Sequence, residues 1–245
     1  MSVHELKEWI NKSHRIVFFG GAGTSTESQI PDFRTAGGLY DKKTSKYPYP
    51  PETMLSHSFY KQNPSVFFEY YKENLIYPEA RPNKAHMALA ELEKQGKLKA
   101  VITQNIDGLH QMAGQNEVIE LHGSIHKNYC ESCKKPYTLS EFLALSGEVP
   151  RCIKCGGIVR PDVVLYEEGL KTRIIEQAIQ ALTLADLLII GGTSLVVYPA
   201  AGLIHYYGGK RLVLINRDAT QVDSKADLVF RESIGEVLHA AVFGD

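Results

Sequence analysis

Residues 16–26 of the chain read IVFFGGAGTST. The four apolar residues from Ile16 to Phe19 run directly into a glycine-rich turn, a pattern typical of a buried parallel strand that enters a tight connection. Glycines at such a place let the backbone approach a pyrophosphate closely, and the N–H groups of the turn supply positive potential. The turn lacks the regular Gly-x-Gly-x-x-Gly spacing, because Thr26 stands three residues after Gly23. It is compatible with a nucleotide site or with a tight connection alone.

Strand-like and helix-like segments alternate along most of the chain. Short apolar runs that repeat the first one follow at 100–103, 118–121, 163–165, 187–190 and 212–215. Helical spacing of apolar residues predicts helices over 3–12, 84–95, 171–185 and 234–242. This alternation predicts an α/β fold with a doubly wound parallel sheet.

The composition is that of a packed globular domain. The chain has 245 residues, of which 44% are apolar and 22% charged, and this argues against disordered and disulfide-stapled classes. With 27 Lys and Arg against 28 Asp and Glu, the formal charge of -1 disfavours nucleic-acid and membrane partners. The charged opening residues and the lack of a spanning apolar run predict a cytoplasmic protein, and we expect a monomer.

Two stretches interrupt the alternation and divide the chain. Residues 38–78 are rich in proline and tyrosine and predict a loop followed by helical material from Ser65 to Leu75. Residues 127–157 hold all four cysteines. We therefore expect a doubly wound domain formed by 1–37, 79–126 and 158–245, a loop and helical insert over 38–78, and a cysteine-bearing module over 127–157.

The cysteines form two pairs, Cys130-x-x-Cys133 and Cys152-x-x-Cys155, separated by 18 residues. Four thiolates at this spacing favour one tetrahedral zinc site per chain. Because four thiolates saturate the metal, we expect this zinc to be structural. A redox dithiol is the alternative.

Two histidines stand where a general base could act. His110 follows Asp107-Gly108-Leu109, and His122 with Gly123 stands just past a predicted strand end. The carboxyl ends of strands line the ligand crevice of such sheets, so the position favours His122. The remaining histidines are expected on the surface or in the core.

Taken together, these motifs resemble the sirtuin family. The motifs occur in sirtuin order over about residues 16–242: the glycine turn, IPDFR at 30–34, TQNID at 103–107, His122-Gly123, the paired cysteines, GTS at 192–194 and Asn216. The resemblance implies a Rossmann-like domain with a zinc-ribbon module and a helical module. It also implies an NAD-dependent protein-lysine deacetylase that consumes NAD and releases nicotinamide and O-acetyl-ADP-ribose.

The resemblance assigns roles to single residues as well. The residues that it assigns to NAD are Gly21, Ala22, Gly23, Ser25, Thr26, Ile30, Asp32, Phe33, Arg34, Gln104, Asn105, Ile106, Asp107, Gly192, Thr193, Ser194, Asn216 and Ile234. Within this set, Asp107 would hold the nicotinamide carboxamide, and Phe33 would lie over the nicotinamide ribose. His122 is the implied general base, and Asn105 is the second residue assigned to catalysis.

The resemblance also places the acyl-lysine substrate. Its peptide would pair as a strand between residues near 165–168 and 196–199. The residues assigned to the peptide are Val164, Tyr166, Glu167, Val196 and Val197. We expect acetyl-lysine proteins or peptides as substrates, because residues 66–75 lack the Arg that succinyl-lysine enzymes of this kind carry.

Three departures from the usual sirtuin pattern lie beside these residues. Gly20 and Gln29 replace the usual Thr and Gly, and Tyr166-Glu167-Glu168 stands where Phe-Gly-Glu is usual. At position 167 a carboxylate therefore replaces glycine beside the peptide. We expect Glu167 to favour targets with Lys or Arg next to the acylated residue, with a solvated surface charge as the alternative.

Two other functions are compatible with the same motifs. A related branch of the family transfers ADP-ribose to proteins and lacks the histidine, so His122 favours deacetylation. A non-catalytic module that senses NAD and binds partners is the second alternative, and the intact base and nicotinamide pocket disfavour it.

Overall fold

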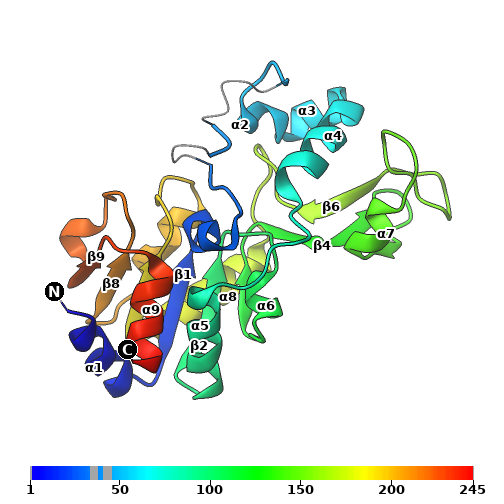
Figure 1. The fold of residues 1–245 in the computed structure, drawn as a ribbon. Helices are drawn as coiled ribbons and strands as arrows, with labels where there is room; N and C mark the ends of the chain where they lie inside the picture. Colours follow the sequence, from blue (N-terminus) through cyan, green and yellow to red (C-terminus); the bar gives the residue numbers. More distant parts are fainter. Residues whose placement is uncertain (1, 34–37, 41–45, 245) are drawn as a thin grey trace.

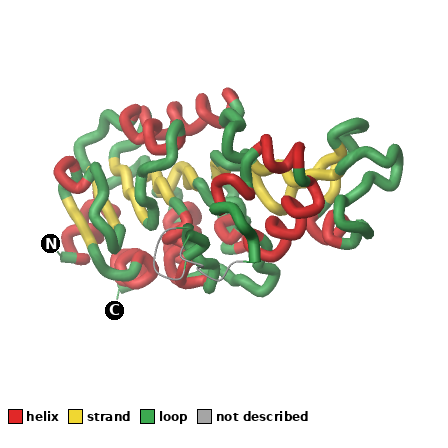
Figure 2. The backbone as a smooth tube through the Cα atoms, turned by 90° about the horizontal axis from the view of Figure 1, so that it is seen from above, coloured by secondary structure: helices red, strands yellow, loops and turns green. Residues whose placement is uncertain are grey.

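The computed structural model describes residues 2–33, 38–40 and 46–244. These residues form a large part built on one sheet and a smaller part built on another, and the two lie side by side (Figures 1 and 2). No helix among the described residues has both the length and the apolar character needed to cross a membrane.

The large part is a six-stranded parallel sheet with the order β3-β2-β1-β7-β8-β9. Its strands are β1 (Ile16–Gly20), β2 (Leu98–Thr103), β3 (Val118–Glu120), β7 (Leu187–Gly191), β8 (Leu212–Ile215) and β9 (Leu228–Phe230). Every residue of β1 and β7 is buried, as expected where helices cover both faces of a parallel sheet. The strand order reverses between β1 and β7, which confirms the predicted doubly wound fold.

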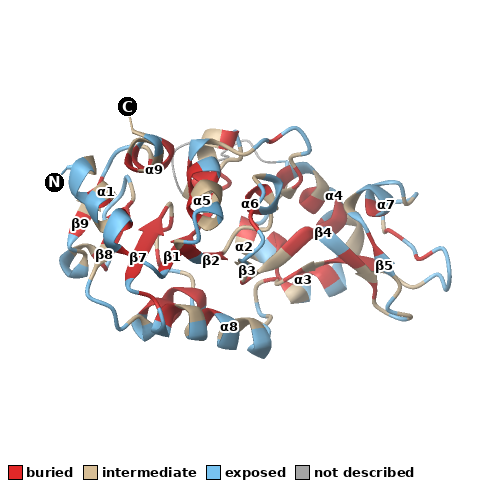
Figure 3. Ribbon diagram, turned by 90° about the horizontal axis from the view of Figure 1, so that it is seen from below, coloured by how far each residue is buried: buried red, intermediate tan, exposed pale blue. Residues whose placement is uncertain are grey.

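Helices cover both faces of this sheet (Figure 3). The helices α1 (Val3–Lys12), α5 (Lys84–Lys94) and α9 (Ile234–Phe243) share one core with Phe18, whereas α8 (Thr172–Thr183) and the 3-10 helix η3 (Ala200–Tyr206) share another with Phe19. Neighbouring residues of a strand point to opposite faces, so Phe18 and Phe19 enter different cores. The short helix α6 (Leu109–Met112) follows β2.

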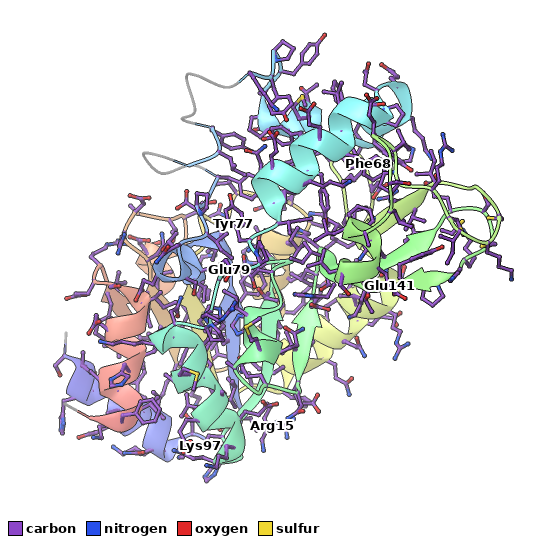
Figure 4. All side chains as sticks on the ribbon, turned by 45° about the vertical axis from the view of Figure 1, so that its right-hand side comes forward. Arg15, Phe68, Tyr77, Glu79, Lys97 and Glu141 are labelled. Carbon is purple, nitrogen blue, oxygen red and sulfur yellow. The ribbon has the colours of Figure 1, made fainter. Side chains whose placement is uncertain are left out.

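The smaller part combines a three-stranded antiparallel sheet with short helices. The sheet has the order β5-β4-β6 and consists of β4 (Gly123–Cys130), β5 (Pro136–Tyr137) and β6 (Val159–Val163). Its helices are α2 (Pro51–Met54), α3 (His57–Gln62), α4 (Pro64–Leu75) and α7 (Leu139–Leu143). Phe68 of α4, labelled in Figure 4, packs against Phe142 of α7 with 6.1 Å between ring centroids. The helical insert and the cysteine-bearing segment therefore share one aromatic core.

Two predictions from the apolar runs need correction. The predicted parallel strand at 163–165 is wrong, because only Val163 is in a strand and that strand, β6, pairs antiparallel with β4 in the smaller sheet. The sixth strand of the large sheet, β9, is absent from the predictions, although its apolar run Leu228–Phe230 is as long as the run at 163–165. The three-part division of the chain stays a prediction, although β4 begins before residue 127 and β6 lies wholly after residue 157.

Candidate active site

A cleft of about 680 Å³ opens at the carboxyl ends of β1, β2, β7 and β8. It includes the point between β1 and β7 where the strand order reverses, the usual ligand site of doubly wound sheets. The predicted NAD residues that line it are Gly21, Ala22, Gly23, Ser25, Thr26, Ile30, Asp32, Phe33, Gln104, Asn105, Ile106, Asp107, Gly192, Thr193, Ser194, Asn216 and Ile234. Arg34 lies outside the described residues. The roles of these residues stay predictions.

The glycine turn packs directly against the turn after β7. The N–H of Gly23 donates to the carbonyl oxygen of Gly192 at 2.8 Å. A Cβ on Gly23 would lie 2.8 Å from the Cα of Gly192, closer than such atoms approach in proteins. The glycines are therefore required for two backbone turns to meet at the floor of the cleft.

A chain of side-chain hydrogen bonds joins the glycine turn to the end of β2. The hydroxyl of Ser25 donates to Oδ2 of Asp107 at 2.7 Å and accepts from Nδ2 of Asn105 at 3.0 Å. The other carboxylate oxygen of Asp107 accepts the N–H of Leu109 at 2.9 Å. Asp107 is thus held in one orientation at the wall of the cleft, where the sequence predicts the nicotinamide carboxamide to bind.

His122 lines the same cleft and has a defined tautomer. Its Nδ1 lies 2.9 Å from the carbonyl oxygen of Gln104, and since a carbonyl can only accept, Nδ1 carries the proton. The lone pair is then on Nε2. Burial lowers the pKa of His122, and the bond to Gln104 opposes this shift only in part. His122 is therefore neutral at pH 7 and able to accept a proton.

The lowered pKa of His122 predicts the pH dependence of catalysis. We expect kcat/KM to be constant near neutral pH and to fall as the pH drops through the pKa of His122, because protonation removes the Nε2 lone pair. The midpoint should lie below the ordinary histidine value of about 6.5. A pH profile of kcat/KM measures it, and an acidic limb centred above that value would contradict the assignment.

The histidine alternative at position 110 is not supported. His110 is 1% exposed and does not line the cleft. Its Nδ1 lies 2.7 Å from Oε1 of Gln115, and its ring packs against His86 with 4.6 Å between centroids. Burial lowers the pKa values of both rings, so both are neutral core residues.

Four of the five predicted peptide residues line the cleft, namely Val164, Tyr166, Glu167 and Val197. Val196 does not line it and is 55% exposed. One carboxylate oxygen of Glu167, Oε2, accepts two hydrogen bonds from Ser58, which orient the charge without neutralising it. The other two departures from the usual sirtuin pattern affect only the backbone or packing around them. Gln29 has a left-handed φ of 65°, and a Cβ on Gly20 would lie 2.5 Å from the ring of Phe18.

Sequence reasoning missed several residues that line the cleft. Arg217 and Asp218 follow Asn216 after β8, and Glu27 lies beside the glycine turn. Tyr77, labelled in Figure 4 just beyond α4, joins them from the other side of the cleft. A signal existed for Arg217 and Asp218, because residues past the carboxyl end of a strand line the crevice in this kind of sheet.

The four cysteines come together in the smaller part. The Sγ atoms of Cys130, Cys133, Cys152 and Cys155 all lie within 4.8 Å of one another. The Sγ atoms of Cys130 and Cys155 are 3.5 Å apart, and those of Cys133 and Cys152 are 3.7 Å apart. Tetrahedral zinc with bonds of about 2.3 Å places its sulfurs roughly 3.8 Å apart, so the set fits zinc. The hydroxyl of Tyr137 donates to Cys152 and lowers its pKa to about 6, which favours the thiolate that zinc needs.

Loss of one thiolate should unload the zinc. We expect Cys133→Ser to reduce the metal content from one zinc per chain toward none and to lower Tm by at least about 5 °C, because metal binding stabilises such modules. Elemental analysis and thermal denaturation measure the two effects. Ser132→Ala, between the first two cysteines, is the control and should retain zinc. Freshly purified active protein without zinc would contradict the site.

Comparison with known proteins agrees with this geometry. The Sir2 family profile matches residues 21–199. The chain belongs to the Sir2 family. It is 61% identical over 237 residues to a Clostridium perfringens protein named NAD-dependent protein deacetylase, with 96% of each chain covered. A Clostridium acetobutylicum protein of the same name is 57% identical over 240 residues, with 98% of each chain covered.

Solved structures of Sir2 proteins have the same fold. A complex of Sir2 with a p53 peptide and NAD+ has a TM-score of 0.85 and 39% identity, and the match covers 97% of this chain and 96% of that one. A structure of Sir2Tm bound to a propionylated peptide has a TM-score of 0.84 and 38% identity, with the same coverage.

Proposed function

We propose that this chain is an NAD-dependent protein-lysine deacetylase. NAD is a consumed co-substrate: its bond to nicotinamide breaks as the acyl oxygen of the substrate lysine bonds to the ribose, and water then releases the free lysine and leaves the acetyl group on ADP-ribose. The proposal is supported by relatives at 57% and 61% identity that carry this name along their whole length. The observation that carries it is His122, whose bond to the Gln104 carbonyl leaves a neutral ring with its lone pair on Nε2 in the cleft.

The chain's own residues fit the steps of this reaction. We assign to Asp107, which Ser25 and Leu109 hold in one orientation, the role of binding the carboxamide that leaves with nicotinamide. Nε2 of His122 takes a proton from a ribose hydroxyl, which makes that oxygen a better nucleophile toward the acyl group. The amide of Gln104 donates to Thr193 at 3.0 Å and so ties the base-bearing side of the cleft to the end of β7.

His122→Ala tests this function. We expect turnover to fall by about 10²- to 10⁴-fold, the usual contribution of a general base, while NAD binding is largely retained. Mass spectrometry should detect O-acetyl-ADP-ribose and deacetylated peptide from wild-type protein, NAD and an acetyl-lysine peptide. His205→Ala changes an exposed histidine outside the cleft and should keep full turnover.

Two results would contradict the proposal. A His122→Ala protein with more than half of wild-type turnover would refute the general base. A wild-type protein that adds the mass of ADP-ribose to proteins and releases no O-acetyl-ADP-ribose would indicate the ADP-ribosyltransferase alternative.

The cleft also predicts the preferred acyl group. Helix α4 contributes the uncharged residues Asn74 and Leu75 to the lining, whereas Nζ of Lys72 lies over the ring of Phe142, at 5.6 Å from its centroid. Among the described lining residues the only Lys or Arg is Arg217, which follows β8. A carboxylate without a partner in such a pocket costs about 3 kcal/mol, or roughly a hundredfold in kcat/KM.

We therefore expect acetyl- and propionyl-lysine peptides to be turned over at least about a hundredfold more efficiently than the succinyl-lysine peptide of the same sequence. Steady-state kinetics on the three matched peptides measure this ratio. Equal or better efficiency on succinyl-lysine would contradict the prediction and would point to Lys72 as an unexpected partner, released from its place over the ring of Phe142.

We further propose that the protein is a cytoplasmic monomer that acts on acyl-lysine proteins or peptides and binds no nucleic acid. The near-neutral composition, with a formal charge of -1, supports the last point.

A further inference from the structure

Glu167 has a backbone conformation that disfavours its own side chain. Its φ is 74°, in the left-handed region where glycine is favoured and other residues are strained. Glycine is the residue usual at this place in the sirtuin pattern. A non-glycine residue persists in such a conformation where surrounding contacts hold it, and strain of this kind gathers at functional sites.

The side chain of Glu167 makes the contacts that hold it. Its Oε2 accepts the backbone N–H of Ser58 at 2.9 Å and the hydroxyl of the same residue at 2.6 Å. Ser58 is the second residue of α3, 109 positions away in the chain. These bonds lower the pKa of Glu167, so its carboxylate is ionised and bound to the helical insert.

The segment that carries Glu167 is tied to its surroundings on both sides. The N–H of Val164 donates to the carbonyl of His122 at 2.9 Å, and the N–H of Tyr166 donates to the carbonyl of Leu55 at 3.1 Å. Glu168 pairs with the buried Arg160 at 2.8 Å. The start of helix α3 also meets both neighbours of Glu167: the N–H of His57 donates to the carbonyl of Tyr166 at 3.0 Å, and Nδ1 of His57 lies 2.8 Å from Oε1 of Glu168. Residues 166–168 together therefore join the wall of the cleft to helix α3, and Glu167 adds the two bonds to Ser58.

The segment 164–168 also contacts residues on the side of the cleft that is predicted to bind NAD. The hydroxyl of Tyr166 lies 3.1 Å from the hydroxyl of Tyr40, and the N–H of Tyr40 donates to the carbonyl of Phe33 at 2.9 Å. Residues 164–168 therefore contact both the helical insert and the segment predicted to cover NAD. Any displacement of this segment moves the predicted acyl-lysine wall.

We propose that Glu167 is a positioning residue that clamps the acyl-lysine segment to helix α3, and that it does not read the charge of the peptide. This inference rests on the proposed function only in taking an acyl-lysine peptide as the ligand. It is offered in place of the expected preference for Lys or Arg beside the acylated residue, because Oε2 of the carboxylate is directed onto the start of helix α3 by two donors of Ser58.

Four variants and one control separate the clamp from charge recognition. Glu167→Gln removes the charge and keeps an oxygen that can accept from Ser58. Glu167→Gly removes both bonds to Ser58 and relieves the strained φ, while the bonds of His57 to Tyr166 and Glu168 remain. Ser58→Ala removes one donor, and the double variant Glu167→Gly with Ser58→Ala tests their coupling. Ser65→Ala is the matched control: Ser65 is the second residue of α4, and its hydroxyl makes no hydrogen bond with the described residues.

Kinetics are measured on two acetyl-lysine peptides, one with neutral flanks and one with Lys flanks, at low and high salt. We expect Glu167→Gly to raise KM for both peptides by about three- to tenfold, with kcat within about twofold of wild type, as for the loss of hydrogen bonds to a charged group at an exposed site. Glu167→Gln should stay within about threefold in KM, and the double variant should be no worse than Glu167→Gly. A KM increase confined to the Lys-flanked peptide, equal in both Glu167 variants and abolished by salt, would overturn the clamp in favour of charge recognition.

Amide hydrogen exchange tests the clamp without any substrate. Residues 57–62 should exchange severalfold faster in Glu167→Gly than in wild type, and at the wild-type rate in Ser65→Ala. Unchanged exchange in Glu167→Gly would overturn the clamp whatever the kinetics. If the wild-type protein shows no deacetylation while exchange changes as expected, the proposed function fails and the clamp stands.

Discussion

The close contact between two glycine turns is the constraint on which the cleft depends. The turn after β1 and the turn after β7 meet through the bond between the Gly23 N–H and the Gly192 carbonyl. Gly192 has a φ of 59°, and a Cβ on it would lie 2.3 Å from the backbone nitrogen of Thr24. Side chains at these positions would separate β1 from β7 at the place where the strand order reverses. The floor of the ligand site is therefore backbone.

The side chains above this floor are ordered by one another. Ser25 joins Asp107 and Asn105, and Gln104 joins Thr193 through its amide and His122 through its carbonyl. Each of these bonds connects residues that follow different strands, so the site exists only when the sheet is assembled. The same bonds set the chemistry: the Gln104 carbonyl selects the tautomer of His122, and burial keeps the ring neutral. The contacts that hold the cleft together therefore also set the protonation state of His122.

The smaller part of the fold supplies the wall of the cleft that faces the large sheet, and the core of the smaller part stabilises that wall. Its aromatic core joins helices α3 and α4 to the cysteine-bearing sheet, so the thiolate cluster supports the helical insert as well as its own strands. From this body the segment 164–168 reaches the cleft, anchored through Arg160 and Ser58. The wall predicted to bind acyl-lysine is therefore positioned by contacts outside the large sheet, whereas the side predicted to bind NAD is positioned by the sheet itself.

The sequence by itself determined what depends on local chemistry. The apolar run before a glycine turn, the paired cysteines and His122 past a strand end are readable because chain neighbours carry the signal. Tertiary structure alone decided what depends on distant partners. The apolar run at 163–165 shows burial but not which sheet buries it, and the structure places Val163 beside β4 in an antiparallel sheet. The sequence shows no hydrogen-bond partner for the carboxylate of Glu167, because that partner, Ser58, lies 109 residues away in the chain. Only folding brings the two donors of Ser58 to this acceptor.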